Sequence, residues 1–279
     1  MTLLDVRNLA VTFRNGTTTV AAVRDVSFTL ERGETLALVG ESGSGKSVTA
    51  LSLLQLLPYP NAEHPHGSIR FNDRELCRAP NQLLETIRGN RIAMIFQEPM
   101  TSLNPLHTIE QQIAEVLILH KEMAPAAAQA RVLELLGLVG IPQPEQRLKS
   151  YPHELSGGQR QRVMIAMALA NEPDILIADE PTTALDVTIQ AQILRLLRDL
   201  QKKFGMAILL ITHDLGIVRK MAQRVAVMQN GLIVEQGPTE PIFTAPQHPY
   251  TQQLLAAEPK GAAVVAQDDA PEILNAANI

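Results

Sequence analysis

The residues best suited to chemistry form a glycine-rich segment, residues 40–47, that ends in Lys46 and Ser47. Glycines let the backbone turn tightly with its N–H groups pointing inward, where they can hold phosphate oxygens. Lys46 would reach the β- and γ-phosphates of a nucleotide such as ATP, and Ser47 would ligate Mg²⁺. The predicted phosphate-binding residues are Gly40, Glu41, Ser42, Gly43, Ser44, Gly45, Lys46, Ser47 and, in the helix that follows, Val48.

The flanks of this segment supply the elements that a phosphate loop needs. Thr35–Val39 is an apolar run that predicts a buried strand. Residues 48–57 lack glycine and proline and predict a helix whose positive end faces the anion. Strand, loop and helix therefore follow one another in the required order. The alternative interpretation is a flexible linker rich in glycine and serine.

Two carboxylates, Asp179 and Glu180, follow another apolar run, residues 175–178. Because ligands of open α/β sheets bind at the carboxyl ends of the strands, this pair is expected to face the phosphate loop. Asp179 is predicted to bind Mg²⁺ through water, and Glu180 to position or deprotonate the attacking water. An isolated pair would more simply be two solvated acids that cap a strand, and the phosphate loop upstream favours the functional interpretation.

The overall composition excludes several classes of protein. A chain of 279 residues that is 46% hydrophobic and 19% charged is long enough for one large or two small folded domains. The net charge of −5 offers no basic footprint for nucleic acid at the level of the whole chain. Cys77 is the only cysteine, which excludes an intrachain disulfide and argues against a cysteine-based metal site. These features predict a reducing, cytosolic compartment.

No segment has the pattern of a signal peptide or a membrane span. Residues 1–7 lack a basic start and an unbroken apolar core, so secretion is not expected. Uninterrupted apolar runs such as Ala207–Ile211 have the length of strands and stay far below the roughly 18 residues of a spanning helix. Any membrane role is therefore expected to act through a partner.

The order of patterns along the chain predicts an α/β fold. Residues 3–39 alternate short apolar runs with turn signals and predict a small antiparallel sheet. Helical periodicity from about residue 100 to 170 predicts an inserted α-helical subdomain. Apolar runs at 175–178 and 207–211, separated by a helical stretch at 188–204, predict a βαβ unit of a parallel sheet.

A five-residue segment, Leu155-Ser156-Gly157-Gly158-Gln159, resembles the signature sequence of the ATP-binding cassette (ABC) ATPases. At the start of the predicted helix 160–169, its serine and glycines would make a second anion-binding nest. In the family the opposite subunit supplies this nest, so the resemblance implies ATP between two head-to-tail ATPase domains, each with a RecA-like parallel-sheet core. A lone Ser-Gly-Gly is usually a turn, and only the order of the motifs gives it this meaning.

Four further positions match those of the family. Phe13 corresponds to the aromatic residue that stacks on adenine, with a place in the core as the alternative. Gln97, after the predicted strand 92–96, corresponds to the glutamine that touches Mg²⁺ and the water while its loop senses the membrane partner. The segment Ala184-Leu185-Asp186 resembles the loop that crosses the dimer interface. His213 resembles the switch histidine that contacts the γ-phosphate. The resemblance implies Glu180, His213 and Gln97 as catalytic residues, Ser47, Gln97 and Asp179 as Mg²⁺ ligands, and Phe13, Ser156, Gly157, Gly158, Gln159 and Asp186 as ATP-binding residues.

Two segments resemble those of one branch of the family, the importers of oligopeptides, dipeptides and nickel. They are the glutamine loop at residues 97–105 and a C-terminal motif at residues 247–251, which can also be a turn before a short helix. Single-domain members of the branch usually carry a C-terminal cysteine cluster that this sequence lacks. The sequence more closely resembles the first ATPase domain of tandem importers of the microcin C and oligopeptide group. It implies an ABC ATPase domain at residues 1–259 and a linker or disordered tail at 260–279.

The resemblance implies an ATP-hydrolysing motor domain that powers import of peptides, including peptide antibiotics, through a membrane permease. Its implied partners are two transmembrane permease subunits, a periplasmic peptide-binding protein acting indirectly and a second ABC ATPase domain, identical or the other half of a tandem, with no nucleic acid. The implied location is the cytoplasmic face of the bacterial inner membrane. Two alternatives are a soluble ABC ATPase that acts on DNA or ribosomes and the ATPase domain of an ABC exporter.

Overall fold

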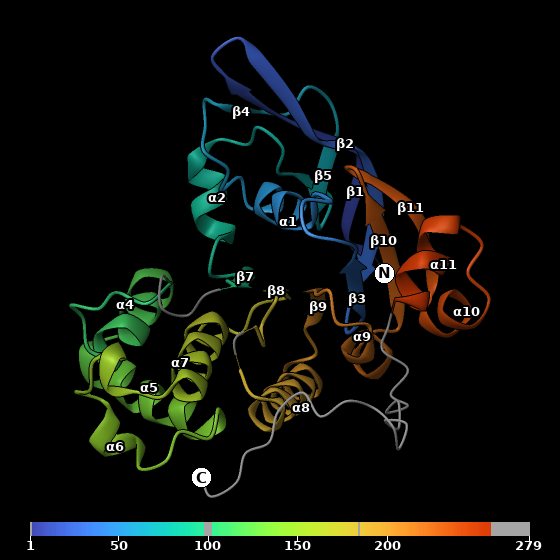
Figure 1. The fold of residues 1–279 in the computed structure, drawn as a ribbon. Coiled ribbons are helices and arrows are strands. Elements are labelled where there is room, and N and C mark those ends of the chain that lie inside the picture. The colour runs from blue at the N-terminus through green and yellow to red at the C-terminus, as the bar shows by residue number, and fades with distance from the viewer. Residues whose placement is uncertain (1, 98–101, 184, 258–279) are drawn as a thin grey trace, which may run out of the picture.

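Antiparallel strands form the N-terminal part of the computed structural model, which describes residues 2–97, 102–183 and 185–257 (Figure 1). These strands are β1 (Thr2–Asn15), β2 (Thr18–Glu31), β4 (Ala62–Glu63), β5 (Ser68–Phe71) and β6 (Arg74–Glu75). β1 and β2 make a long hairpin that turns at Gly16, where φ is +60°, a conformation that glycine adopts without strain. β1 also pairs with β4 and β5. The predicted antiparallel sheet is therefore confirmed, and residues 62–75 enlarge it.

Five parallel strands form the core of the sheet, in the order β10-β3-β9-β8-β7. They are β3 (Thr35–Val39), β7 (Ile92–Ile95), β8 (Ile175–Asp179), β9 (Ala207–Ile211) and β10 (Arg224–Gln229). Every residue of β3, β8 and β9 is buried, because helices cover both faces and only continuous apolar runs tolerate that position. β11 (Leu232–Pro238) pairs with both β10 and β2 and joins the two parts into one sheet of 11 strands.

Helices cover the parallel strands on both sides (Figure 1). α1 and α2 lie on one side of the sheet and α8 on the other, while α9, α10 and α11 surround the end near β10 and β11. Their bounds are α1 (Lys46–Leu53), α2 (Asn81–Ile87), α8 (Val187–Phe204), α9 (Leu215–Met221), α10 (Thr239–Thr244) and α11 (Pro249–Ala256). None of the helices in the described ranges is both long enough and apolar enough to cross a bilayer.

A group of helices lies to one side of the sheet, between β7 and β8 in the chain (Figure 1). The group comprises α4 (Ile109–Lys121), α5 (Pro125–Leu138), α6 (Pro144–Arg147), the 3₁₀ turn η1 (Pro152–Glu154) and α7 (Gly157–Leu169). Apolar residues of α4, α5 and α7 share one buried cluster with residues of β7, β8 and α8. The helices are therefore packed onto the core that carries the strands of the candidate site.

Two predicted helix boundaries differ from the structure by three residues or more. The helix predicted at 48–57 ends at Leu53, because Gln55 adopts a left-handed φ of +50° and Pro58 follows soon after. The helix predicted at 160–169 begins already at Gly157, because Ser156 and Gln159 form a reciprocal capping box. The second difference places the glycines of the predicted signature inside the first helical turn.

Candidate active site

The predicted phosphate loop connects the buried strand β3 to helix α1 and is closed around the amine of Lys46. Lys46 Nζ donates to the carbonyl oxygens of Gly40 at 2.8 Å and Glu41 at 2.9 Å, and to Ser44 Oγ at 3.3 Å. Lys46 is buried, and this burial lowers the pKa of its amine. A cation held among neutral oxygens is poised to exchange them for the oxygens of an anion.

Close packing explains why the loop requires glycine at two of its positions. A Cβ atom on Gly40 would lie 2.2 Å from the carbonyl oxygen of Met228 on β10, and the φ of Gly40 is +148°. A Cβ atom on Gly45 would lie 2.7 Å from the carbonyl oxygen of Ala22 on β2, at a φ of +104°. Larger residues at these two positions would push the loop off the sheet.

Ser47 and Asp179 come together although 132 positions separate them in the chain. Ser47, in the first turn of α1, donates its hydroxyl to Asp179 Oδ1 at the end of β8, at 3.2 Å. Burial raises the pKa of Asp179, and the nearby carboxylate of Glu180 raises it further. The described residues contain no cluster of three or more His, Cys, Asp or Glu side chains that could hold a metal ion. A hydroxyl and one carboxylate fit Mg²⁺, which combines one or two protein oxygen ligands with substrate phosphates.

Glu180 lies at the centre of a hydrogen-bond network from three parts of the chain. Its Oε2 accepts hydrogen bonds from Thr183 Oγ1 at 2.8 Å and Gln97 Nε2 at 3.0 Å, and its Oε1 lies 3.1 Å from His213 Nδ1. Burial raises the pKa of Glu180, but the hydrogen bonds from Thr183 and His213 outweigh it and lower the pKa overall. Glu180 is therefore an ionised carboxylate at neutral pH, held in a left-handed backbone conformation with a φ of +47°.

The topology explains why these residues converge. Gln97 follows β7, Asp179 ends β8, Glu180 follows it, and His213 follows β9, and these three strands are parallel neighbours in the sheet. Their carboxyl ends therefore meet at one edge, beside the loop that follows β3. The structure brings together the predicted residues of the phosphate loop, Ser47, Gln97, Asp179, Glu180 and His213.

The remaining predicted residues have local partners. Ser156 accepts from the N–H of Gln159 at 3.3 Å, and Asp186 caps α8 by accepting from the N–H of Ile189 at 3.0 Å. Ile189 also contacts α7, since a Cβ atom on Gly158 would lie 2.9 Å from Ile189 Cγ2. The predicted signature and the segment of Asp186 thus form a joint surface at the start of α7 and α8. Ala184 lies outside the described residues, as do residues 98–101 of the predicted glutamine loop and the predicted tail at 260–279.

Phe13 lies on β1 of the antiparallel hairpin, whose strand β2 approaches the phosphate loop at Ala22. It is partly exposed and pairs with Val20 on β2 and with Ala62 on β4. Its side chain also packs against the buried cluster beneath the antiparallel strands. The structure therefore gives Phe13 both a share in the core and an exposed surface, and its predicted contact with adenine stays a prediction.

Two polar contacts of the site were not predicted from the sequence. The hydroxyl of Thr183 donates to Glu180, and the hydroxyl of Tyr250 accepts a hydrogen bond from the N–H of Glu41 at 3.0 Å. The signal for Thr183 was its place three residues after Glu180. Tyr250 was part of the C-terminal motif, but nothing in the sequence indicated that this motif touches the phosphate loop.

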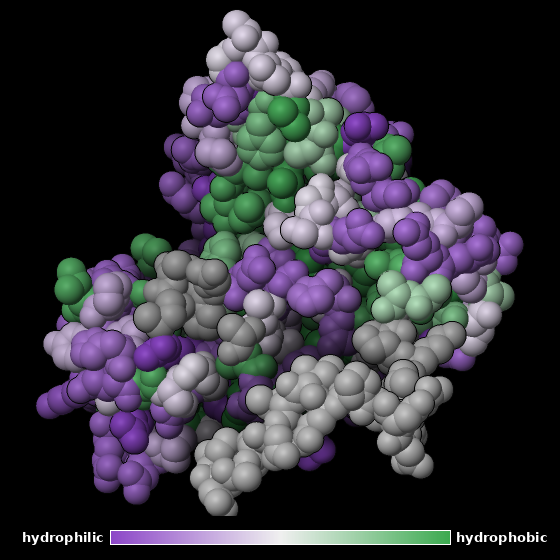
Figure 2. Space-filling view, in the orientation of Figure 1, coloured by the Kyte–Doolittle hydropathy of each residue, from purple (hydrophilic) through white to green (hydrophobic). Residues whose placement is uncertain are grey.

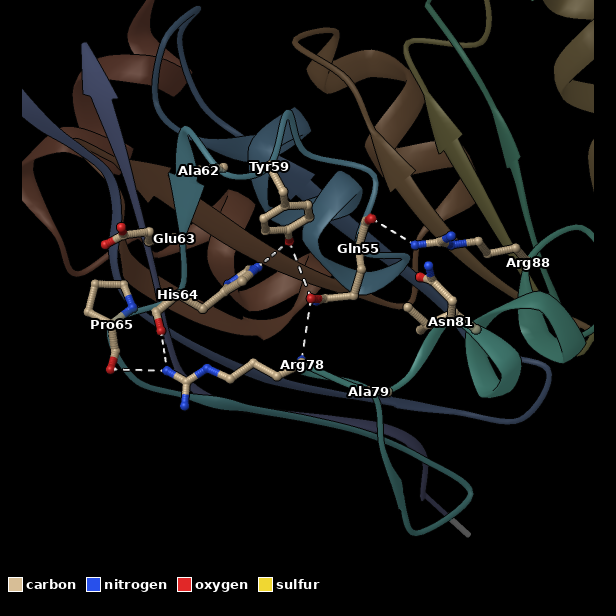
Figure 3. A pocket seen from close by; sticks show the side chains of 11 residues that line it. Gln55, Tyr59, Ala62, Glu63, His64, Pro65, Arg78, Ala79, Asn81 and Arg88 are labelled. Carbon is tan, nitrogen blue, oxygen red and sulfur yellow. Dashed lines mark hydrogen bonds between the residues drawn. The ribbon is translucent and has the colours of Figure 1, made fainter. Parts of the chain in front are cut away.

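A cavity of about 540 Å³ lies at the end of α1, and no predicted site residue is among its lining residues (Figure 3). Gln55, Tyr59, His64, Arg78 and Arg88 are among its lining residues. The hydroxyl of Tyr59 lies 2.7 Å from His64 Nε2, and burial raises the pKa of Tyr59 to about 12. The two arginines donate to backbone carbonyls around the cavity. The polar groups here mainly tie the backbone together, so this cavity is not a candidate for the nucleotide site.

The buried charge of Asp179 leads to a prediction about stability. The raised pKa means that, above the ordinary aspartate pKa, the folded state holds this proton more tightly than the unfolded state, so stability falls as pH rises. We expect Asp179→Asn to melt at a higher temperature than the wild type near neutral pH, by about 2–4 °C for each kcal/mol gained. The measurement is calorimetry of the nucleotide-free protein, repeated at about pH 4.5, where the difference should shrink. A lower melting temperature for the variant at neutral pH would contradict the prediction.

The chain is similar to known proteins over most of its length. The sequence model of the family described as ABC transporter matches residues 23–183, more than half of the chain. The chain is 66% identical to the peptidoglycan transport ATP-binding protein YejF of Agrobacterium fabrum over 93% of its own length and 47% of that protein. It is 55% identical to the dipeptide transport ATP-binding protein DppD of Bacillus subtilis over 92% of its own length and 77% of that protein. The chain thus spans about half the length of the Agrobacterium relative.

A solved structure agrees with the fold. The dimeric post-hydrolysis state of the ATP-binding cassette MJ0796, bound to ADP and Pi, superimposes with a TM-score of 0.75 at 28% identity, covering 85% of this chain and 98% of the other. The predicted α/β fold, with a parallel core, an antiparallel part and added helices, is therefore confirmed. The match to the family model, the two relatives and the shared fold together show that the chain belongs to the ABC transporter family of ATP-binding proteins.

Proposed function

We propose that this chain is an ATP-hydrolysing motor domain that powers the import of peptides through a membrane permease. One observation carries the proposal: a buried lysine in a phosphate loop, a paired hydroxyl and carboxylate, and an ionised glutamate meet at one edge of a parallel sheet. ATP hydrolysis needs these groups together, because phosphoryl transfer is catalysed mainly by positioning and electrostatic stabilisation.

Each group has a distinct part in hydrolysis. Lys46 and the loop N–H groups hold the phosphates, with Lys46 releasing the carbonyl oxygens of the loop to do so. Glu180 accepts a proton from the attacking water at a carboxylate oxygen, while the water oxygen bonds to the γ-phosphorus and ADP leaves with the electrons of the broken bond. Gln97 and His213, which hold Glu180 from two sides, orient that carboxylate. Mg²⁺, bound at Ser47 and Asp179 with Gln97 nearby, would neutralise charge on the phosphates.

A second ABC ATPase domain is part of the proposal. The nest at the start of α7 lies beside the start of α8, and its residues Ser156 and Gly157 are exposed. It can bind phosphate on a partner domain, as the dimeric arrangement of the MJ0796 cassette suggests. The partner is either a second copy of this domain or a different ABC domain. In either case each ATP site would combine the phosphate loop of one domain with the nest of the other.

An apolar groove beside Gln97 is the proposed docking site for the permease. The groove, of about 200 Å³, lies between the core and the helical group, and Leu56, Phe96, Val116, Met164 and Met167 are among its lining residues. Leu56 and Phe96 are each 40% exposed, so the groove presents adjoining apolar surface to a partner. In the view of Figure 2 the helical group is mostly hydrophilic, with a few hydrophobic residues at its edge. Two permease subunits, each on one ATPase domain, would bring the assembly to the cytoplasmic face of the membrane.

The class of cargo follows from the relatives. They are named for dipeptide, oligopeptide and peptidoglycan transport, and these names do not favour an action on DNA or ribosomes or an export role. We therefore propose a peptide cargo, delivered by a periplasmic binding protein that contacts the permease and not the ATPase.

The groove leads to a test of this function. We expect Leu56→Glu to lower uptake of a radiolabelled peptide by cells roughly tenfold or more, since a charge at an apolar contact costs at least about 1.4 kcal/mol. The purified variant should bind ATP as the wild type does, because Leu56 does not touch the phosphate loop. Leu56→Met, which keeps the position apolar and close to its original volume, is the matched control and should leave uptake unchanged. Wild-type uptake by Leu56→Glu cells would count against permease docking in this groove.

A further inference from the structure

The hydroxyl of Tyr250 reaches the phosphate loop from the far end of the chain. Tyr250 lies on α11 and accepts a hydrogen bond from the N–H of Glu41 at 3.0 Å, across 209 positions in the sequence. Its side chain is only 6% exposed, and it belongs to the buried cluster that contains Ala37 and Val39 of β3. The ring therefore packs under the strand that leads into the loop, and the hydroxyl contacts the second residue of the loop itself.

Polar contacts fix the start of α11 and with it the position of Tyr250. The carboxylate of Glu235, on β11, accepts from the N–H groups of Gln247 at 2.8 Å and His248 at 3.1 Å. Burial raises the pKa of Glu235, but the backbone N–H groups lower it overall, so the carboxylate is ionised and binds them strongly. His248 Nδ1 then accepts from the N–H of Tyr250 at 3.2 Å. The whole segment is thus tied to β11, and the tyrosine cannot easily swing away.

The loop peptide between Gly40 and Glu41 is held from two directions. Lys46 Nζ donates to the carbonyl oxygens of both residues, while Tyr250 accepts from the N–H of that peptide. When phosphate oxygens draw the amine of Lys46 away, the bonds from Lys46 weaken and the bond to Tyr250 remains. Gly40 already packs against β10 without room for a Cβ atom, so a shift of this peptide would move the entire loop.

The geometry points to Tyr250 as a positioning residue of the nucleotide site, whose hydroxyl keeps the phosphate loop in its ATP-binding form. The inference rests on the proposed function, because it presumes that this loop binds ATP. It gives the C-terminal segment around Tyr250 a role in nucleotide affinity, separate from any contact with a transport partner.

Tyr250→Phe tests the role of the hydroxyl, because the ring that fills the cluster is retained. We expect the Kd of ATP to rise roughly three- to tenfold, the range expected for one lost hydrogen bond. The KM for ATP should rise in parallel, while kcat at saturating ATP stays within about twofold, because Glu180 and its partners are untouched. Isothermal titration calorimetry and a phosphate-release assay on the purified chain measure the two quantities. Glu235→Gln replaces one acceptor oxygen with an amide donor that faces a backbone N–H, which weakens the hold on the start of α11. The Kd of ATP should therefore also rise.

Tyr59→Phe is the matched control. It also removes one partly buried tyrosine hydroxyl with a hydrogen-bond partner, but in the separate cavity of Figure 3. Its Kd for ATP should equal that of the wild type. If wild type and Tyr250→Phe bind ATP equally, the positioning role is wrong and the proposed function stands. If Tyr250→Phe loses kcat together with the melting temperature of the nucleotide-free protein, the hydroxyl is merely structural. If the wild type binds no ATP, the proposed function itself fails.

Discussion

Glu180→Gln is expected to reduce steady-state ATP hydrolysis by roughly 10²–10⁴-fold while ATP remains bound. The amide keeps the size of the side chain and one acceptor oxygen, but it cannot take a proton from water. The lowered pKa of Glu180 means that the wild-type carboxylate is already ionised at neutral pH, so the loss reflects the missing base and not a change of protonation. A phosphate-release assay measures turnover, and calorimetry of ATP binding measures occupancy.

The matched control for this prediction is Glu85→Gln, the same chemical change at an exposed position on α2. It should hydrolyse ATP at the wild-type rate. A Glu180→Gln protein with wild-type turnover would rule out Glu180 as the base, and a protein that no longer binds ATP would show that the carboxylate acts in binding instead.

The Glu180→Gln protein also reports on the second ATPase domain. Because it binds ATP without consuming it, a dimer that ATP holds together should persist in light scattering with ATP and Mg²⁺ and dissociate with ADP. A dimer seen only with ATP would mean that two copies of this domain close on each other. A monomer that still binds ATP would favour a partner domain of different sequence.

Lys46→Met is expected to weaken ATP binding by roughly a hundredfold or more, since hydrogen bonds from a charged donor contribute about 1.5–3 kcal/mol each and Lys46 would contact two phosphates. Methionine keeps the length of the side chain in the buried loop. Burial lowers the pKa of Lys46, so removing its charge offsets part of the stability that is lost with its hydrogen bonds. The melting temperature without nucleotide should therefore change by only about 2–4 °C.

Calorimetry of ATP binding and a thermal melt of the nucleotide-free protein measure the two effects of Lys46→Met. Lys202→Met, on the exposed end of α8, is the control and should bind ATP as the wild type does. Retained ATP affinity in Lys46→Met would mean that the loop N–H groups alone hold the phosphates. A collapse of the melting temperature would mean that the bonds from Lys46 to Gly40 and Glu41 are needed for folding.

Some parts of the fold could be predicted from the sequence because they depend on local patterns. The predicted strands at Thr35–Val39 and Ala207–Ile211 have the observed bounds, since strands buried on both faces must be apolar throughout. The end of α1 was missed because the left-handed turn at Gln55 has no glycine to signal it. β10 and β11 were not predicted, and their role of joining the parallel and antiparallel parts depends on pairing with distant strands.

The candidate site likewise has parts that the sequence determined and parts that only the tertiary structure decided. The sequence by itself determined the loop at residues 40–47, because a phosphate loop is a continuous segment whose glycines, lysine and serine act within a few residues of one another. Only the tertiary structure decided which side chains touch Glu180, since Gln97, Thr183 and His213 meet through neighbouring strands and a turn. It also decided the directions of the pKa shifts, which depend on burial. The bond from Glu41 to Tyr250 is the clearest case, because hydrogen bonds across 209 positions leave no periodicity or spacing in a sequence.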